Sequence, residues 1–189
     1  MTHAFRRRAA AAALALVAAF STQVLAEATT AGASSVGAAR LAEAPGERRN
    51  IILWNIRSRR CVNGPGTDGG NVLLLRCNSG WGHDRWDLVK VKDGAGNDVP
   101  HQYVVVNTAT KACLEIGGWS TADGATAMTY GCHQGTNQKW HLVARNDGYY
   151  EFWNVATKKC LDARFVEEWT DIYQWRCHQG GEQLWWIGV

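Results

Sequence analysis

The stretch CHQGTNQKW, residues 132–140, returns near the end of the chain as CHQGGEQLW, residues 177–185. One interpretation is a metal site that recruits the Cys and the His of both copies. The other is an internal repeat. Side chains of neighbouring residues in a strand point to opposite faces of the sheet, so an adjacent Cys–His pair rarely binds one ion. The recurrence therefore favours an internal repeat, and the sequence predicts no metal site.

A wider alignment gives three copies of the repeat. Each copy opens with a motif in which an Asn precedes a Cys by six residues: WNIRSRRCVN from Trp54, VNTATKACLE from Val106 and WNVATKKCLD from Trp153. A second Cys follows 16, 19 and 17 residues later. A tryptophan closes each copy: Trp86, Trp140 and Trp185. Three copies at a period of about 50 residues indicate a repeat architecture.

The apolar stretches within the repeats are short and are bounded by Gly, Asp or Asn. YVVVN at 103–107 and YEFWNV at 150–155 are rich in β-branched and aromatic residues, which is typical of strands. No stretch has the length and spacing of an amphipathic helix. The pattern predicts an all-β domain of about twelve strands, four per repeat. One repeat is too small to bury its own apolar face, so the three copies should share a core that contains the closing tryptophans, most simply around a threefold pseudo-axis.

The N-terminal residues predict export. Three arginines at 6–8 precede an apolar run at 9–20, and VLA ends at Ala26, which is the pattern of a secretory signal peptide over residues 1–26. The apolar run is shorter than the roughly 20 residues that a membrane span needs. Residues 27–49 are rich in Ala, Gly, Ser and Thr and predict a flexible leader. All ten tryptophans lie beyond it, in a folded domain expected at residues 50–189.

The charge of the chain gives little support to a nucleic-acid partner. The full sequence carries 20 Lys and Arg against 17 Asp and Glu, a formal net charge of +3. The signal peptide holds three of the arginines and no acidic residue, so its removal leaves a net charge of zero. Binding to phosphates depends on a basic surface, and the mature chain has only short basic runs.

The cysteines indicate an oxidising compartment. Six lie beyond residue 26, and an even number in an exported chain predicts three disulfides. Six cysteines allow 15 pairings, among which the count alone does not choose. The glycines fall at turns and form neither a phosphate loop nor a dinucleotide fingerprint, so no cofactor is expected.

Three Cys-to-Cys loops, each followed by Gln-x-Trp or a variant of it, resemble the ricin B-chain-type lectin family, whose members are β-trefoils with α, β and γ lobes. The motif stands as NQKW at 137–140 and EQLW at 182–185, and it departs as HDRW at 83–86. The resemblance covers residues 50–189. It implies a β-trefoil with three pseudo-symmetric lobes and one disulfide within each lobe: Cys61–Cys77, Cys113–Cys132 and Cys160–Cys177.

The resemblance also implies where a sugar would bind. The family places an Asp two residues after the first Cys, an aromatic residue two before the second, and Asn-Gln before the Trp. A carboxylate suits vicinal hydroxyls, and a ring suits the C–H face of a sugar. In the γ lobe these positions and their neighbours imply the leading site, with Trp169 as a second ring: Asp162, Tyr173, Trp175, Gln183 and Glu182, which replaces Asn.

The other two lobes match the family pattern less well. In the β lobe the implied binding residues are Glu115 in the Asp position, Tyr130 as the ring, Asn137 and Gln138, and Trp119 is a possible second platform. The α lobe has Asn63 for Asp, Leu75 for the ring and Asp84 for Gln, and is expected to be only structural.

Together these features predict a secreted lectin for galactose-type sugars or polysaccharides. No enzymatic activity is expected, because the cysteines are paired and the acidic cluster of Glu167, Glu168 and Asp171 is typical of a solvated loop. The alternative is a protein-binding trefoil, such as a protease inhibitor or a toxin-like receptor-binding subunit. Its anchors would be exposed tryptophans: Trp119, Trp169 and Trp175.

Overall fold

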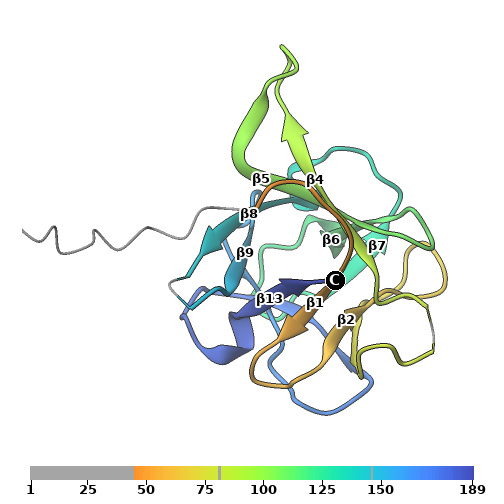
Figure 1. Ribbon diagram of the computed structural model, residues 1–189. Helices are drawn as coiled ribbons and strands as arrows, with labels where there is room; N and C mark the ends of the chain where they lie inside the picture. The colour runs from red at the N-terminus through yellow and green to blue at the C-terminus, as the bar shows by residue number, and fades with distance from the viewer. Residues whose placement is uncertain (1–44, 81, 146) are drawn as a thin grey trace, which may run out of the picture. The chain divides into compact units, whose positions relative to one another are not determined.

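The computed structural model describes residues 45–80, 82–145 and 147–189 (Figure 1). The predicted signal peptide and most of the predicted leader lie outside these residues. The first strand begins at Arg48, before the expected domain start at residue 50. Two contacts tie the preceding residues to the domain, since the Tyr103 hydroxyl donates to the Pro45 carbonyl and the Lys90 amide donates to the Glu47 carboxylate. Residues 45–49 are therefore part of the folded unit.

The described part of the chain is built from strands and three single-turn 3-10 helices. The elements are β1 (Arg48–Asn55), β2 (Cys61–Asn63), β3 (Leu73–Leu75), β4 (Trp86–Lys92), β5 (Asp98–Asn107), β6 (Cys113–Ile116), η1 (Gly117–Trp119), β7 (Ala127–Tyr130), η2 (Thr136–Gln138), β8 (Lys139–Ala144), β9 (Tyr150–Asn154), β10 (Cys160–Asp162), β11 (Thr170–Asp171), β12 (Tyr173–Trp175), η3 (Gly181–Gln183) and β13 (Trp185–Gly188). The predicted all-β class is confirmed.

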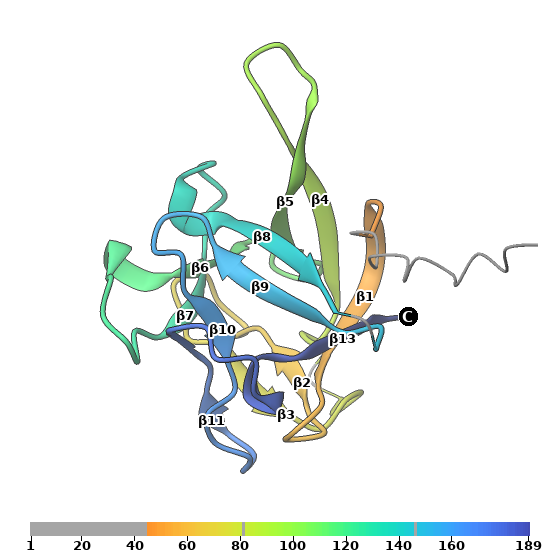
Figure 2. The ribbon, with the colours of Figure 1, turned by 90° about the vertical axis from the view of Figure 1, so that its left-hand side faces the viewer.

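Six of the strands close a barrel. The antiparallel pairs β1–β4, β4–β5, β5–β8, β8–β9, β9–β13 and β13–β1 form a complete ring. The hairpins β2–β3, β6–β7 and β10–β12 lie outside this ring. Isolated bridges join these hairpins to one another at Asn71–Met128 and Thr126–Tyr173, and β11 pairs with β3. This threefold arrangement of a barrel and three hairpins is the predicted β-trefoil (Figure 2).

The three closing tryptophans lie in the core, as predicted. Trp86, Trp140 and Trp185 are fully buried in one apolar cluster. Each indole Nε1–H donates to the main-chain carbonyl that follows the first Cys of its lobe, at 2.9 Å to Val62, 3.0 Å to Leu114 and 3.1 Å to Leu161. A buried indole N–H needs such a partner, so the same bond is made three times.

The Asn at the start of each repeat joins its own lobe to a neighbouring lobe. The Asn154 Oδ1 accepts the amide hydrogens of Ala156 and Thr157, which closes a turn. Its Nδ2 donates to the Asn137 carbonyl of the preceding lobe at 2.8 Å. Asn55 and Asn107 make the equivalent bonds at their own lobe boundaries. The repeated motif thus encodes both a turn and a contact between lobes.

The three disulfides implied by the family resemblance are confirmed. Each joins the two cysteines of one lobe: Cys61–Cys77, Cys113–Cys132 and Cys160–Cys177. The bridges close loops of 16, 19 and 17 residues, and a loop of this size stabilises the folded state by about 3 kcal/mol in the chain-entropy model. They fix the hairpins that hold the candidate binding residues.

Candidate functional site

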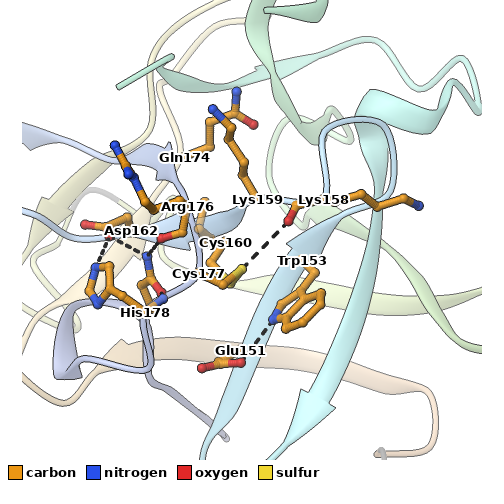
Figure 3. The surroundings of a disulfide bond; sticks show 12 residues. Glu151, Trp153, Lys158, Lys159, Cys160, Asp162, Gln174, Arg176, Cys177 and His178 are labelled. Atoms are coloured by element: carbon orange, nitrogen blue, oxygen red, sulfur yellow. Dashed lines mark hydrogen bonds and ion pairs between the residues drawn. A yellow bond between two sulfur atoms is a disulfide. The ribbon is translucent and has the colours of Figure 1, made fainter. Parts of the chain in front are cut away.

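The γ lobe holds a buried carboxylate at the end of β10. The Oδ2 atom of Asp162 accepts a hydrogen bond of 2.8 Å from Gln183 Nε2 and one of 3.2 Å from His178 Nε2 (Figure 3). Oδ1 receives no hydrogen bond from the residues that the structure describes. Burial raises the pKa of the Asp162 carboxyl, while the hydrogen bonds from Gln183 and His178 act in the opposite direction. One carboxylate oxygen is held in place, and the other remains for a ligand.

The CHQG turn positions the histidine that holds this carboxylate. The Gly180 amide donates to His178 Nδ1 at 3.1 Å, so in the neutral ring the proton is on Nε2, which donates to Asp162. The His178 amide donates to Gln183 Oε1 at 2.8 Å. Gln179 has a φ of 60°, and a side chain at Gly180 would collide with Glu182 and lie 2.8 Å from the His178 ring. The turn requires glycine at that position.

The β lobe repeats the arrangement with a glutamate. Glu115 Oε2 accepts 2.8 Å from Gln138 Nε2 and 3.2 Å from His133 Nε2. The His133 amide donates to Gln138 Oε1 at 2.8 Å, and the Gly135 amide donates to His133 Nδ1 at 3.1 Å. These distances equal those of the γ lobe. The longer glutamate side chain therefore meets the same two donors. We call this unit of carboxylate, His and Gln the clamp.

An open pocket of about 270 Å³ lies beside the β-lobe clamp. Its lining is Glu115, Gly118, Trp119, Met128, Tyr130 and His133. Trp119 is 54% exposed and Tyr130 is 51% exposed. The centroid of each of these rings lies 6.2 Å from that of the His133 ring. Glu115 Oε1 accepts no hydrogen bond within the described part of the chain, so the pocket offers an unused carboxylate oxygen between aromatic walls.

The predicted ring of the γ lobe is covered by a neighbouring side chain. The guanidinium carbon of Arg164 lies 4.2 Å from the centroid of the Trp175 ring. Tyr173 stands opposite Asp162 in the β10–β12 pair, and its own ring meets the Phe165 edge with a centroid distance of 6.2 Å. The structure thus brings Asp162, Tyr173 and Gln183 together, whereas the predicted second ring, Trp169, lies at the α lobe. It places Arg164 on the ring that was expected to receive the sugar.

The amide side chains predicted to contact a sugar are buried and bond within the protein. Gln138 and Gln183 are buried, and both serve the carboxylate. Asn137 is also buried, and its Nδ2 reaches the Ile116 carbonyl at 3.4 Å. Glu182 forms an ion pair with Arg57. Within the described residues, each of these four side chains is thus engaged by a protein partner.

The α lobe has no clamp. Asn63 occupies the carboxylate position, and its Nδ2 donates back to the Cys61 carbonyl at 3.1 Å. Asp84 stands where the other lobes have Gln, and it accepts the Asn78 amide at 2.6 Å. Leu75 fills the ring position and is buried. The α lobe therefore presents no carboxylate at the family's position.

The family model described as ricin-type beta-trefoil lectin domain-like matches residues 82–175. This match and the β-trefoil structure confirm the resemblance to the ricin-type lectin family that the sequence showed. A search of curated proteins gave no match. Among solved structures, the chain is similar to the designed threefold-symmetric protein ThreeFoil, with 26% identity, a TM-score of 0.66 and coverage of 74% of this chain and 97% of that one.

Two natural proteins of known structure are also similar. An exo-β-1,3-galactanase from Clostridium thermocellum shares 25% identity with a TM-score of 0.67, over 75% of this chain and 30% of that one. A Polyporus squamosus lectin, bound to the human-type influenza-binding epitope Neu5Aca2-6Galb1-4GlcNAc, shares 16% identity with a TM-score of 0.60, over 74% of this chain and 48% of that one. The ricin-type trefoil thus has carbohydrate-active neighbours in structure.

The two clamp histidines were not among the site residues predicted from the sequence. His133 and His178 sit in the repeated CHQG stretch, which was interpreted only as a sign of the repeat. The sequence does contain a sign of this role. The His and the Gly of CHQG are identical in the β and γ lobes, although the carboxylate residue changes from Glu115 to Asp162. Within the described ranges, no three metal-binding side chains gather at one place. No helix among those residues is long and apolar enough to cross a membrane.

Proposed function

We propose that this ricin-type trefoil binds a neutral carbohydrate in its β lobe, with Glu115 as the hydrogen-bond acceptor and Trp119 and Tyr130 as platforms. The observation that carries the proposal is the open pocket in which a held carboxylate faces two half-exposed rings. A sugar presents vicinal hydroxyls on its edge and C–H groups on its face. The pocket offers a partner for each.

The clamp prepares Glu115 for this role. A carboxylate fixed through Oε2 by two donors loses little freedom when a ligand binds to Oε1, and preorganisation of this kind lowers the cost of association. Hydrogen bonds from hydroxyls to an ionised carboxylate are stronger than neutral ones. The affinity for one sugar should still be weak, with a Kd of about 1 mM or about −4 kcal/mol.

The γ lobe is proposed as a second site. Its clamp is equivalent, but the ring face of Trp175 carries the Arg164 guanidinium, so a ligand must displace that cation or share the ring with it. We therefore rank it after the β lobe. Two weak sites on one domain would act together on a polysaccharide that presents many copies of a sugar.

Galactose-type glycans are the first ligands to test. The family resemblance suggests them, and the 25% identity with an exo-β-1,3-galactanase supports β-1,3-galactan as a candidate polymer. We propose further that the protein is exported and acts outside the cell. Its three disulfides suit an oxidising compartment.

We propose binding without turnover. Hydrolysis of a glycoside in the usual way needs two carboxyl groups that flank the scissile bond, about 5–9.5 Å apart. The residues that line the β-lobe pocket include one carboxylate, Glu115. Release of reducing sugar from galactan and xylan, measured over a day, tests this part of the proposal, and catalytic release that persists after repurification would contradict it.

A glycan array with four forms of the disulfide-intact protein tests the proposed function. These are the wild type, Glu115→Gln, Asp162→Asn and the double variant. Both substitutions keep the shape of the side chain and remove its charge. Binding lost mainly with Glu115→Gln supports the β lobe. The absence of binding by a folded wild type would contradict carbohydrate recognition and would favour a protein partner that uses Trp119, Trp169 and Trp186, which are exposed.

A further inference from the structure

We propose a second kind of sugar site, at the boundary between the α lobe and the long loop of the γ lobe, which we call the composite site. Trp169 would be its platform, and Glu168 its acceptor. The proposal rests on the proposed carbohydrate-binding function, and it assigns a role to a lobe whose own family positions hold no carboxylate and no ring.

The γ-lobe loop is fixed on the α lobe by backbone hydrogen bonds. Strand β11 pairs with β3, with Thr170 opposite Leu74 (Figure 2). The Trp169 amide donates to the Leu74 carbonyl at 2.9 Å. Asn71 Nδ2 donates to Asp171 Oδ1 at 3.1 Å. The loop therefore delivers its side chains to the neighbouring lobe at a defined position.

A pocket of about 210 Å³ lies at this boundary. Leu75, Arg76 and Ser79 line it from the α lobe, and Glu168 and Trp169 line it from the γ-lobe loop. Leu75 occupies the position that Tyr130 has in the β lobe, so the family's ring position holds no ring in the α lobe. Trp169 supplies one from the adjacent lobe.

Trp169 and Trp119 share two unusual properties. Each is 54% exposed. Each also has a left-handed backbone, with φ of 66° at Trp169 and 56° at Trp119. This conformation is unfavourable for a bulky side chain, but eight other non-glycine residues of the described chain also have a positive φ, so it does not by itself mark a site. Both tryptophans stand beside a pocket that contains a hydrogen-bonded glutamate.

The glutamate of the composite site is held on one oxygen only. Glu168 Oε1 accepts 2.8 Å from Arg76 Nε and lies 3.9 Å from Arg60 Nε. Its Oε2 takes part in no hydrogen bond among the described residues. Glu115 is held in the same way, although by His and Gln. The two pockets thus reach a similar arrangement of ring and half-used carboxylate with different residues.

This chemistry suits a neutral pyranose. The C–H face would lie on Trp169, one hydroxyl would donate to Glu168 Oε2, and a neighbouring hydroxyl would accept from the Arg76 guanidinium. With the β-lobe pocket, the composite site would give the domain two attachment points on one polymer.

The test is an NMR titration of the disulfide-intact full chain with β-1,3-galactobiose, followed at the indole N–H signals of Trp169 and Trp119. Trp169→Gly and Trp119→Gly serve to assign the signals and as a matched pair. Glycine adopts both left-handed conformations without strain, so each variant removes a ring and keeps its loop. Glu168→Gln tests the acceptor.

We expect saturable shifts at both indoles. Trp169→Gly should abolish one set, leave the Trp119 titration unchanged and weaken retention on immobilised galactan by about three- to tenfold. Glu168→Gln should weaken the Trp169 titration alone. Saturation at Trp119 with no shift at Trp169 would overturn the composite site and leave the β-lobe proposal standing. Shifts at Trp169 alone would support the composite site against the β lobe, and no shift at either ring would overturn both.

Discussion

The β and γ lobes contain the same clamp but differ in how accessible the aromatic ring beside it is. In both, a carboxylate oxygen is bound at 2.8 Å by a glutamine and at 3.2 Å by a histidine. Beside Glu115 the pocket is open and lined by exposed rings. Beside Asp162 the Trp175 ring is covered by Arg164.

The difference between the lobes shows that two separate segments determine the hydrogen-bond acceptor and its accessibility to a ligand. The clamp is built from a short turn that the repeat copies, CHQG followed by Gln. Access depends on the loop between the two cysteines, which differs in length and composition between the lobes. The β-lobe loop turns back through Gly118 and places Trp119 beside its own carboxylate. The γ-lobe loop runs instead to the α lobe through β11.

The largest effect is expected from removing the charge of the acceptor. Glu115→Gln keeps the two clamp donors occupied but loses hydrogen bonds to an ionised group, which contribute about 1.5–3 kcal/mol. Binding of β-1,3-galactobiose, measured by calorimetry, should weaken by about 10- to 100-fold. Asp162→Asn is the matched change in the other lobe. A larger loss with Asp162→Asn would reverse the proposed ranking.

A smaller loss is expected when one clamp donor is removed. His133→Phe keeps a ring beside Trp119 and Tyr130 but donates nothing to Glu115. Loss of one hydrogen bond of about 1 kcal/mol should weaken β-lobe binding about fivefold. His178→Phe is the control and should leave β-lobe binding unchanged. Equal losses from both variants would indicate a general effect on the fold.

A gain is expected when Trp175 is uncovered. A cation over an exposed ring contributes about 0.5–1 kcal/mol, which a ligand must overcome to stack there. Arg164→Ala, measured in the Glu115→Gln background, should therefore tighten γ-lobe binding about two- to fivefold. Arg176→Ala removes the same charge without touching the ring. An equal gain from Arg176→Ala would assign the effect to net charge.

The smallest expected effect is on the pH dependence of stability. Because burial raises the pKa of Asp162, the folded chain keeps this proton to a higher pH than the unfolded chain. Between the two pKa values the free energy of unfolding must fall as pH rises, relative to Asp162→Asn. Chemical denaturation of both proteins between pH 3 and 7 measures it. A stability difference between wild type and Asp162→Asn that grows with pH would contradict the raised pKa.

Sugar binding at the γ lobe should have the opposite pH dependence, because it needs the ionised carboxylate, and it should be lost toward acid.

The repeat made much of the fold predictable. The burial of the closing tryptophans and the all-β class follow from motifs that recur at fixed spacing. The tryptophan and asparagine motifs make the same local bonds in every lobe, whereas the clamp forms in two lobes. The approach of Asp162 to Gln183 is what the family resemblance implied.

The features that sequence reasoning missed lie in the loops. Arg164 covers Trp175. Trp169 lies at the α lobe because residues 169–172 make backbone hydrogen bonds to residues 72–74 of another repeat. Such pairing depends on backbone hydrogen bonds between segments that are far apart in the chain, and no local pattern encodes it. The recurrence of His133 and His178 is plain in the repeat. Their role as donors to the carboxylate depends on the geometry of the turn, which the sequence does not show.

A crystal structure of the disulfide-intact chain with β-1,3-galactobiose tests the central claim most directly. We expect one sugar ring between Trp119 and Tyr130, with a hydroxyl bound to Glu115 Oε1 and the bonds from His133 and Gln138 to Oε2 retained. A sugar bound elsewhere, with the β-lobe pocket empty and Oε1 without a ligand, would contradict the proposed function.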